Sequence, residues 1–355
     1  MSEKTKPGSE GTQDKAKTTA KQTRGGTAGT AKSKKTKTAK TAATRNTKRR
    51  GASKRPKSAR GTRTTRAARI TSPKQWWAKA TLGQKIKATL VSLVAIICVM
   101  ALAMGTVRFV QWRIEVRAAE ARQAELVKTY DFDPGDIISD GQFFNANALS
   151  QAEIQSFLDK EGAQCTGNDC LKSKTFDTTD QPADEYCSAY SGAKHETAAA
   201  IIYKAGKACG ISQKILLTVL QKEQHLVTAT EITDSQYKSA MGLSCPDDAN
   251  CDPEYAGFFK QVYGSAKRYQ YYVAHEDRYG YHANALNFIQ YHPNKACGGT
   301  NVFIDNKATA LLYIYTPYQP NDAALAAGVG EGDACSSYGN RNFAIIYQSW
   351  FGSMR

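Results

Sequence analysis

A stretch of 20 consecutive residues without a charge, Ala88–Val107, stands out from the rest of the sequence. About 20 apolar residues are needed for one helix to cross the hydrocarbon core of a bilayer. Trp76 and Trp77 precede the stretch and Trp112 follows it, as expected for aromatic side chains at the two membrane interfaces. We therefore predict a transmembrane helix over residues 86–108.

Two alternatives to a transmembrane helix remain open for this stretch. A core helix of a soluble protein is the first, although such helices seldom run so far without a charge. A cleaved signal peptide is the second, because Ala101-Leu102-Ala103 has the A-x-A form of a cleavage site. The stretch and the segment before it are both longer than in ordinary signal peptides, which favours an uncleaved anchor.

The charges are distributed very unevenly along the chain. Residues 1–87 contain 26 Lys and Arg against three acidic residues, whereas residues 126–355 contain 18 Lys and Arg against 26 Asp and Glu. Lys and Arg beside a membrane helix stay on the cytoplasmic side. This asymmetry predicts a single-pass protein of the cell membrane with a cytoplasmic N-terminus and an extracellular C-terminal part.

Residues 1–80 form a tail that is rich in Lys, Thr and Ala and has no aromatic residue before Trp76. Such a segment buries too little apolar surface to offset its ordering entropy, so we predict disorder. Three roles remain open for the tail: a solvated topology signal, attraction to anionic lipid, or phosphate contacts with nucleic acid.

Cysteine usage agrees with export. Cys98 lies in the apolar stretch, and the other eight cysteines follow it in even number, as in a disulfide framework. Because short loops close at low entropic cost, we expect pairing between neighbours in sequence. There is no CxxC pair and no HExxH motif, so we predict no metal and no cofactor. The expected pairs are Cys165–Cys170, Cys187–Cys209, Cys245–Cys251 and Cys297–Cys335.

Beyond the apolar stretch, residues 109–133 read as a helical stalk that ends in the turn sequence Asp131-Phe132-Asp133-Pro134-Gly135. Residues 134–355 should form the extracellular domain. Its apolar periodicity predicts a mainly α fold with a little β, of the α+β class. The predicted helices cover residues 150–158, 197–208, 211–227, 255–276 and 343–351. Residues 301–304 are predicted to form a strand. Residues 308–314 could form a helix or a strand.

The predicted helix over residues 211–228 contains one carboxylate in an otherwise apolar stripe. An acid on an inward face costs free energy unless it is paired or neutral. Burial raises the pKa of a carboxyl group, as a general acid working near neutral pH requires. The alternative is a Glu that forms a salt bridge at the edge of the core or lines a polar gap. The stripe consists of Leu216, Val219, Leu220, Glu223, Leu226 and Val227.

The order of an apolar helix, Glu223, a loop and then Ala240-Met241-Gly242-Leu243 resembles the lysozyme-like fold of bacterial lytic transglycosylases. In that family the catalytic Glu ends an apolar helix, and a Gly-Leu turn helps to build the substrate cleft. The resemblance implies that Glu223 is the catalytic acid and base. Gln224 stands where that family usually has Ser, and Ser244-Cys245 where Met-Gln would complete the turn.

A closer resemblance extends over nearly all of residues 134–355. The domain is similar to a group of exported actinobacterial cell-surface proteins often labelled hemagglutinin-like. The matching stretches are GDIISDGQFFNANALSQAEIQSFL, CGISQKILLTVLQKEQHLVT, AMGLSCPD, GFFKQVYGSAKRYQYY, YHPNKACG, TALLYIYTPYQPN and CSSYGNRNFAIIYQSWFG.

The transglycosylase resemblance also implies a set of cleft residues, because that family places a Tyr late in the domain near the Glu. His292 and Asn294 are weaker candidates. Glu231, Asp234 and Glu276 are candidates for a second carboxylate, which lytic transglycosylases do not need. The implied substrate-binding residues are Gln224, Met241, Gly242, Leu243, Tyr291, Tyr313 and Tyr315.

Two functions follow from this sequence. The first is a membrane-anchored enzyme, of the lytic transglycosylase or muramidase type, that cleaves the glycan strands of peptidoglycan with Glu223. The second is a lysozyme-like domain that binds wall glycan or a host surface without cleaving it, as an adhesin or as a scaffold for wall assembly.

Overall fold

The computed structural model describes residues 72–245 and 251–355. The predictions of disorder and of lipid or nucleic-acid binding by the tail concern residues outside this part, except near the end of the tail. There, Pro73–Lys79 forms a short helix, α1, in place of the predicted disorder. The described part is mainly helical with two small antiparallel sheets, which confirms the predicted secondary-structure class.

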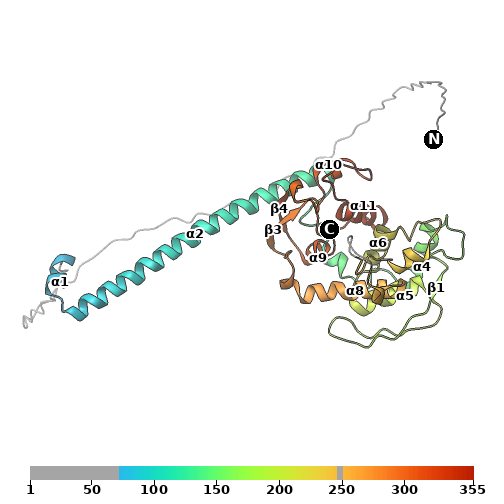
Figure 1. The fold of residues 1–355 in the computed structure, drawn as a ribbon, viewed down its shortest axis with the longest axis horizontal. Helices are drawn as coiled ribbons and strands as arrows, with labels where there is room; N and C mark the ends of the chain where they lie inside the picture. The colour runs from blue at the N-terminus through green and yellow to red at the C-terminus, as the bar shows by residue number, and fades with distance from the viewer. Residues whose placement is uncertain (1–71, 246–250) are drawn as a thin grey trace, which may run out of the picture. The chain divides into compact units, whose positions relative to one another are not determined.

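Helix α2, Leu82–Tyr130, is 49 residues long (Figure 1). It begins with a capping box between Thr81 and Gln84 and ends at Asp131, which takes the left-handed conformation with φ 52°. The predicted membrane segment and stalk are therefore one continuous helix, and its end confirms the predicted turn. Its apolar part has the length and composition to cross a membrane, and none of that part is buried inside the described protein, unlike a core helix.

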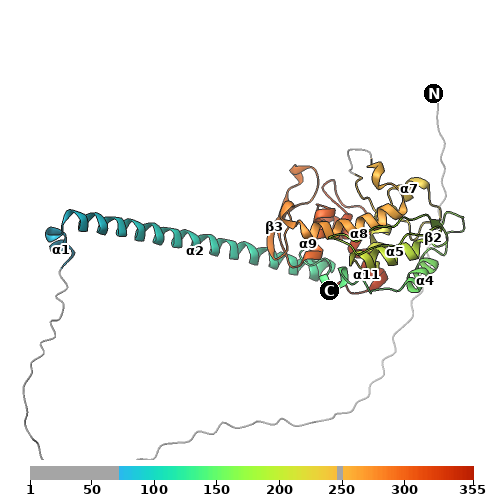
Figure 2. The ribbon, with the colours of Figure 1, turned by 90° about the horizontal axis from the view of Figure 1, so that it is seen from below.

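The last turns of α2 are packed into the domain instead of forming a separate stalk (Figures 1 and 2). Val116, Ala119, Gln123 and Leu126 are buried, and the helix packs against the strand β4, Gly299–Ile304. The predicted boundary at residue 133 thus separates two segments that share one core.

The side-chain amide of Gln123 joins α2 to the edge of the sheet. Its Oε1 accepts from the backbone N–H of Phe303 at 2.9 Å, and its Nε2 donates to the Phe303 carbonyl and to Asp133, each at 3.2 Å. Gly135 lies against this contact, where a Cβ would be 2.2 Å from the Phe303 carbonyl oxygen. Only glycine fits there without a backbone shift, so the turn after α2 can press against β4.

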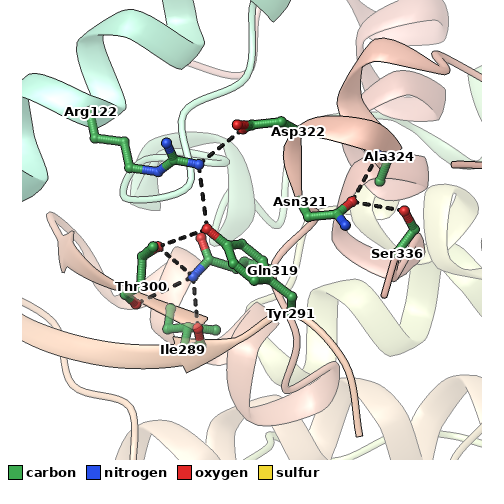
Figure 3. A network of polar contacts seen from close by, with 9 residues as sticks. All are labelled: Arg122, Ile289, Tyr291, Thr300, Gln319, Asn321, Asp322, Ala324 and Ser336. Carbon is green, nitrogen blue, oxygen red and sulfur yellow. Dashed lines mark hydrogen bonds and ion pairs between the residues drawn. The ribbon is translucent and has the colours of Figure 1, made fainter. Parts of the chain in front are cut away.

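A second polar network holds the same junction (Figure 3). Arg122 of α2 donates to Asp322 at 2.9 Å and to the Tyr291 hydroxyl at 3.4 Å. Gln319 donates to the Ile289 carbonyl at 2.8 Å and to the Thr300 hydroxyl at 2.9 Å. These bonds connect the helix, the hairpin and the segment that leads into α10, Asp322–Ala326.

The hairpin pairs β3, Ala285–Gln290, with β4 in antiparallel register, from Ala285 opposite Ile304 to Gln290 opposite Gly299. The sequence predicted only residues 301–304 of β4. The second sheet is shorter: β1, Thr175–Phe176, pairs with β2, Glu196–Thr197.

The core lies among helices that pack around α5. Helix α5 packs against α4, α6 and α8, while α11 packs on α6 and α9 packs on α8. The capping box predicted at Ser150 is present, with the Glu153 backbone N–H donating to the Ser150 hydroxyl. The bounds are α4 Gln151–Glu161, α5 Ala198–Cys209, α6 Gln213–Gln224, α8 Phe258–Ala274, α9 Lys307–Tyr315 and α11 Gly339–Phe351.

Short elements complete the described part. They are the helices α3 Asp140–Phe143 and α7 Asp234–Lys238, and the 3-10 turns η1 Pro253–Tyr255, η2 Glu276–Arg278 and η3 Lys295–Cys297.

All four predicted disulfides are formed, which confirms the pairing of neighbours in sequence. Cys187–Cys209 attaches the loop before β2 to the end of α5, and Cys245–Cys251 closes the segment between the Gly242 turn and η1. Cys98 is a free, exposed cysteine of α2. Eight bridged cysteines fit an oxidising compartment.

Candidate functional site

Helix α6 places Glu223 in its last turn. The helix ends at Gln224, and His225 takes the left-handed conformation with φ 56°. The predicted helix to Val227 is therefore too long, and Leu226 and Val227 are buried in the turn that follows it. Because the chain turns directly after Gln224, the carboxylate lies at the rim of the core and not within a longer apolar stripe.

The side chain of Glu223 is 23% exposed and borders a cavity of about 460 Å³. Its Oε1 lies 2.5 Å from the ammonium of Lys222, which is 10% exposed. Lys222 also donates to the Thr316 hydroxyl at 3.3 Å. The acid is thus ion-paired at the core edge, as the salt-bridge alternative predicts, and it also faces an open cavity.

The turn that faces Glu223 contains Gly242, whose φ of 70° favours glycine. A Cβ at this position would lie 3.0 Å from Oε2 of Glu223. Gln261 of α8 holds the turn: its Oε1 accepts from the N–H groups of Met241 and Leu243, each at 3.0 Å, and its Nε2 donates to the Leu243 carbonyl at 3.0 Å. Three hydrogen bonds from one buried amide fix the wall beside the carboxylate.

Tyr315, the last residue of α9, forms another wall of the cavity. Its hydroxyl donates to the Met241 carbonyl, which ties α9 to the turn. The ring of Tyr269 lies behind it, with centroids 5.4 Å apart. Burial, followed by the Glu223 carboxylate, raises the pKa of Tyr269; burial, followed by Tyr269 and Glu223, raises the pKa of Tyr315. Both phenols therefore stay protonated and can act as donors.

The cavity gathers residues from four segments that are distant in the sequence: the end of α6, the Gly242 turn, α8, and the end of α9 with the residues after it. Arg268 is the second cation that borders it, after Lys222. The lining consists of Lys222, Glu223, Gly242, Leu243, Ser244, Cys245, Arg268, Tyr272, Tyr315, Thr316, Pro317 and Tyr318.

Some of the implied substrate-binding residues lie elsewhere. Tyr313 is fully buried and donates to the Pro134 carbonyl at 2.9 Å, so it belongs to the core. Tyr291 lies at the α2 junction with Arg122. The side chain of Met241 is buried in the core, and only its carbonyl reaches Tyr315. Gln224 is not among the lining residues of this cavity.

The other candidates also lie outside the cavity. His292 and Asn294 bond within their own turn. Glu276 accepts from the Ala283 N–H at 2.8 Å, and Asp234 lies 3.7 Å from Lys174, while Glu231 is exposed. Among the described residues, Glu223 is thus the one carboxylate that lines the cavity.

Several residues of this site were not predicted from the sequence, among them Gln261, Lys222 and Arg268. A signal existed for Gln261, because a Gln between Phe258 and Val262 falls on the apolar face of its helix. The sequence contains no such signal for Lys222, because a Lys next to a Glu is common on helix surfaces.

The fold and the site define a mainly helical, disulfide-bonded domain with one carboxylate at the rim of a tyrosine-lined cavity. In the described ranges, no group of three or more His, Cys, Asp and Glu side chains could hold a metal ion. Comparison with protein families, with curated proteins and with solved structures found no match for this chain.

Proposed function

We propose that this chain is a membrane-anchored enzyme that cleaves the glycan strands of peptidoglycan, with Glu223 as its single catalytic acid and base. The observation that supports this most is the position of Glu223, between the Gly242 turn and Tyr315 in an open cavity of about 460 Å³. A lysozyme-like arrangement of the type found in lytic transglycosylases has these three parts.

In the proposed reaction, the carboxyl group of Glu223 donates a proton to the glycosidic oxygen as the bond to C1 breaks. The same carboxylate then accepts the proton of the attacking hydroxyl, from water or from the sugar itself. For the first step the contact with Lys222 must open. Lys222 would then keep its hydrogen bond to the Thr316 hydroxyl, which is 3.3 Å long.

The proposed topology follows from the basic tail and from α2. We place the N-terminus in the cytoplasm, α2 across the cell membrane and the disulfide-bonded domain outside, where peptidoglycan is found. Lys and Arg remain on the cytoplasmic side of a membrane helix, and disulfides persist in an exported domain.

A binding-only function is the alternative, and one contact favours it. A carboxylate held by an ammonium donates no proton while the pair is closed, and the Lys222–Glu223 pair is closed in this structure. In that case the domain is a wall-binding or adhesin domain, as the label hemagglutinin-like suggests for the group it resembles.

The substitution Glu223→Gln tests the proposal. It keeps the size and polarity of the side chain but cannot donate the proton, so we expect peptidoglycan cleavage to fall about 100- to 10,000-fold, the usual contribution of general acid–base catalysis. The assay measures the solubilisation of purified peptidoglycan by the full chain in detergent and identifies the fragments by mass, including any 1,6-anhydro ends.

The matched control is Glu231→Gln, which removes an exposed carboxylate outside the cavity and should leave cleavage unchanged. Full activity in a folded Glu223→Gln protein would refute the catalytic assignment. A wild-type protein that binds peptidoglycan without releasing fragments would establish the alternative.

A further inference from the structure

A second, larger cavity lies on another face of α8. Its volume is about 700 Å³. Its walls come from α8, from η1 and from the loop before β2 that the Cys187–Cys209 disulfide attaches to α5. Arg268 lines both this cavity and the Glu223 cavity. Gly264 lies between them, close against the side chain of Leu243, so the two cavities adjoin across one turn of α8.

We propose that this second cavity binds a saccharide that carries a carboxylate. Its aromatic lining includes Tyr186, Tyr255 and Tyr263, and its cations are Lys260, Lys267 and Arg268. The flat faces of tyrosine rings suit the apolar C–H faces of a sugar, and cations on the same wall suit a carboxylate.

The charges of the lining argue for an acidic ligand and against a cationic one. Three cations line the cavity against one carboxylate, Glu254. Lys267 is already paired with Asp184, and Arg268 lies over the rings of Tyr255 and Tyr271, at 5.8 and 5.9 Å. Lys260 is exposed, so its ammonium can reach an anion without first breaking a buried contact.

Tyr263 supplies an independent observation. The residue is 6% exposed, and its hydroxyl has no hydrogen-bond partner among the described residues. A buried hydroxyl without a partner costs free energy. A ligand hydroxyl or carboxylate in the cavity would supply the missing partner.

The inference rests on the proposed function only in naming the natural source of the ligand. Peptidoglycan carries free carboxylates on its stem peptides, and on the lactyl group of a muramic acid that has lost its stem peptide. A glycan bound at Glu223 could therefore place such a carboxylate in the second cavity, beyond Arg268. Uronic-acid polymers have the same chemistry, and the experiment separates these two sources.

The test measures binding and not cleavage. Isothermal titration of the full chain in lipid nanodiscs would use four probes: a disaccharide–tetrapeptide fragment of peptidoglycan, a neutral chitin tetramer, an oligogalacturonate and oligothymidylate. We expect the peptidoglycan fragment to bind at least about tenfold more tightly than the neutral tetramer, as one charge-assisted contact implies. If oligogalacturonate bound more tightly than the peptidoglycan fragment, the site would still be supported, but its natural ligand would be a uronic-acid polymer and not peptidoglycan.

Two variants decide where that ligand binds. Lys260→Gln should raise its Kd about tenfold, whereas the control Lys238→Gln, at an exposed position outside both cavities, should not change it. Tyr263→Phe should raise the Kd about three- to tenfold without lowering the melting temperature, because the hydroxyl it removes has no partner in the protein.

An unchanged Kd in either Lys260→Gln or Tyr263→Phe would overturn the proposal. Equal affinity for the neutral tetramer, or tighter binding of oligothymidylate, would also overturn it. A wild-type protein that binds the fragment through this cavity but cleaves no peptidoglycan would support this inference while refuting the catalytic role of Glu223.

Discussion

Tyr313 and Tyr315 lie two positions apart on α9, and their side chains have different environments. Residues two apart on an α-helix point about 200° away from each other, so only one of this pair can face the cavity. Tyr315 lines it, and Tyr313 points into the core, where its hydroxyl bonds to the Pro134 carbonyl. The sequence allowed helix or strand here, and in a strand both would have shared one face.

This difference gives a paired prediction. Tyr313→Phe leaves the buried Pro134 carbonyl without its donor, so we expect the free energy of unfolding to fall by about 1–3 kcal/mol and the activity or glycan affinity per folded molecule to stay unchanged. Tyr315→Phe should instead lower activity or glycan affinity, because it removes the bond between the end of α9 and the Met241 carbonyl in the turn beside Glu223. Urea unfolding and the peptidoglycan assay on both variants check this, and equal functional loss in the two would contradict it.

Asp305 carries a prediction about pH. Partial desolvation, followed by the nearby carboxylates of Asp133, Asp136 and Glu120, raises its pKa to about 6 from an ordinary value of 3.8. The folded protein therefore holds this proton more tightly than the unfolded chain does. As pH rises from about 4 to 6 the unfolded chain loses the proton first, so the contribution of Asp305 to stability falls, and above pH 6 the loss is complete.

Asp305→Asn should thus be more stable than the wild type at pH 8, and the difference should shrink to a small fraction of that value at pH 4. Urea unfolding in detergent at a series of pH values between 4 and 8 measures the difference. A gap that is constant over this range would show that the substitution acts through packing and not through titration.

At the scale of the elements, the best predictions were those with a local chemical signal. The stop of α2 at Tyr130 and the start of α4 after Ser150 follow from turn and capping residues that bond within their own segment. The end of α6 lacked such a signal, because His225 takes a left-handed conformation that glycine usually occupies. The strand β3 was missed because its burial alternation is hidden in the sequence: the polar Asn287 is buried and the aromatic Phe288 is exposed.

The site was predictable to a similar degree. Glu223, Gly242, Leu243 and Tyr315 lie together as the resemblance implies. Gln261 and Arg268 were not found, because their roles depend on how α8 lies against the Gly242 turn, and no spacing within one segment encodes that.

The junction between α2 and β4 gives the prediction at this scale. Gln123→Ala removes three hydrogen bonds, two to the backbone of Phe303 and one to Asp133, and leaves buried backbone groups unpaired. We expect amide exchange at Phe303 to become at least about tenfold faster. The control is Arg117→Ala, at an exposed position of the same helix, which should leave the exchange rate at Phe303 unchanged. An unchanged exchange rate in Gln123→Ala as well would show that apolar packing alone holds the junction.

For the whole molecule, the continuity of α2 sets the proposed distance between membrane and domain. Val116 is the first buried residue of the helix, nine residues beyond Val107, the end of the uncharged stretch. At 1.5 Å per residue this is roughly 13 Å. In the proposed topology, the domain therefore begins close to the bilayer surface.

The topology itself is open to a direct experiment. In the proposed topology, protease added to intact cells without their wall should digest the domain and spare a tag fused to residue 1, because Lys and Arg beside a membrane helix stay on the cytoplasmic side. Permeabilised cells are the control, in which the tag should be lost as well. Loss of the tag in intact cells, with survival of the domain, would reverse the proposed orientation.

Large exposed apolar side chains of α2 continue beyond the uncharged stretch, from Leu82 to Ile114, roughly 48 Å of helix, with Lys85, Lys87, Arg108 and Arg113 among them. A hydrocarbon core of about 30 Å is shorter than this, and a helix that is too long for its bilayer tilts. Because Gln123 and Arg122 fix the domain to the same helix, any tilt is passed on to the domain. Lipid composition, through bilayer thickness, would then set the direction in which the Glu223 cavity faces.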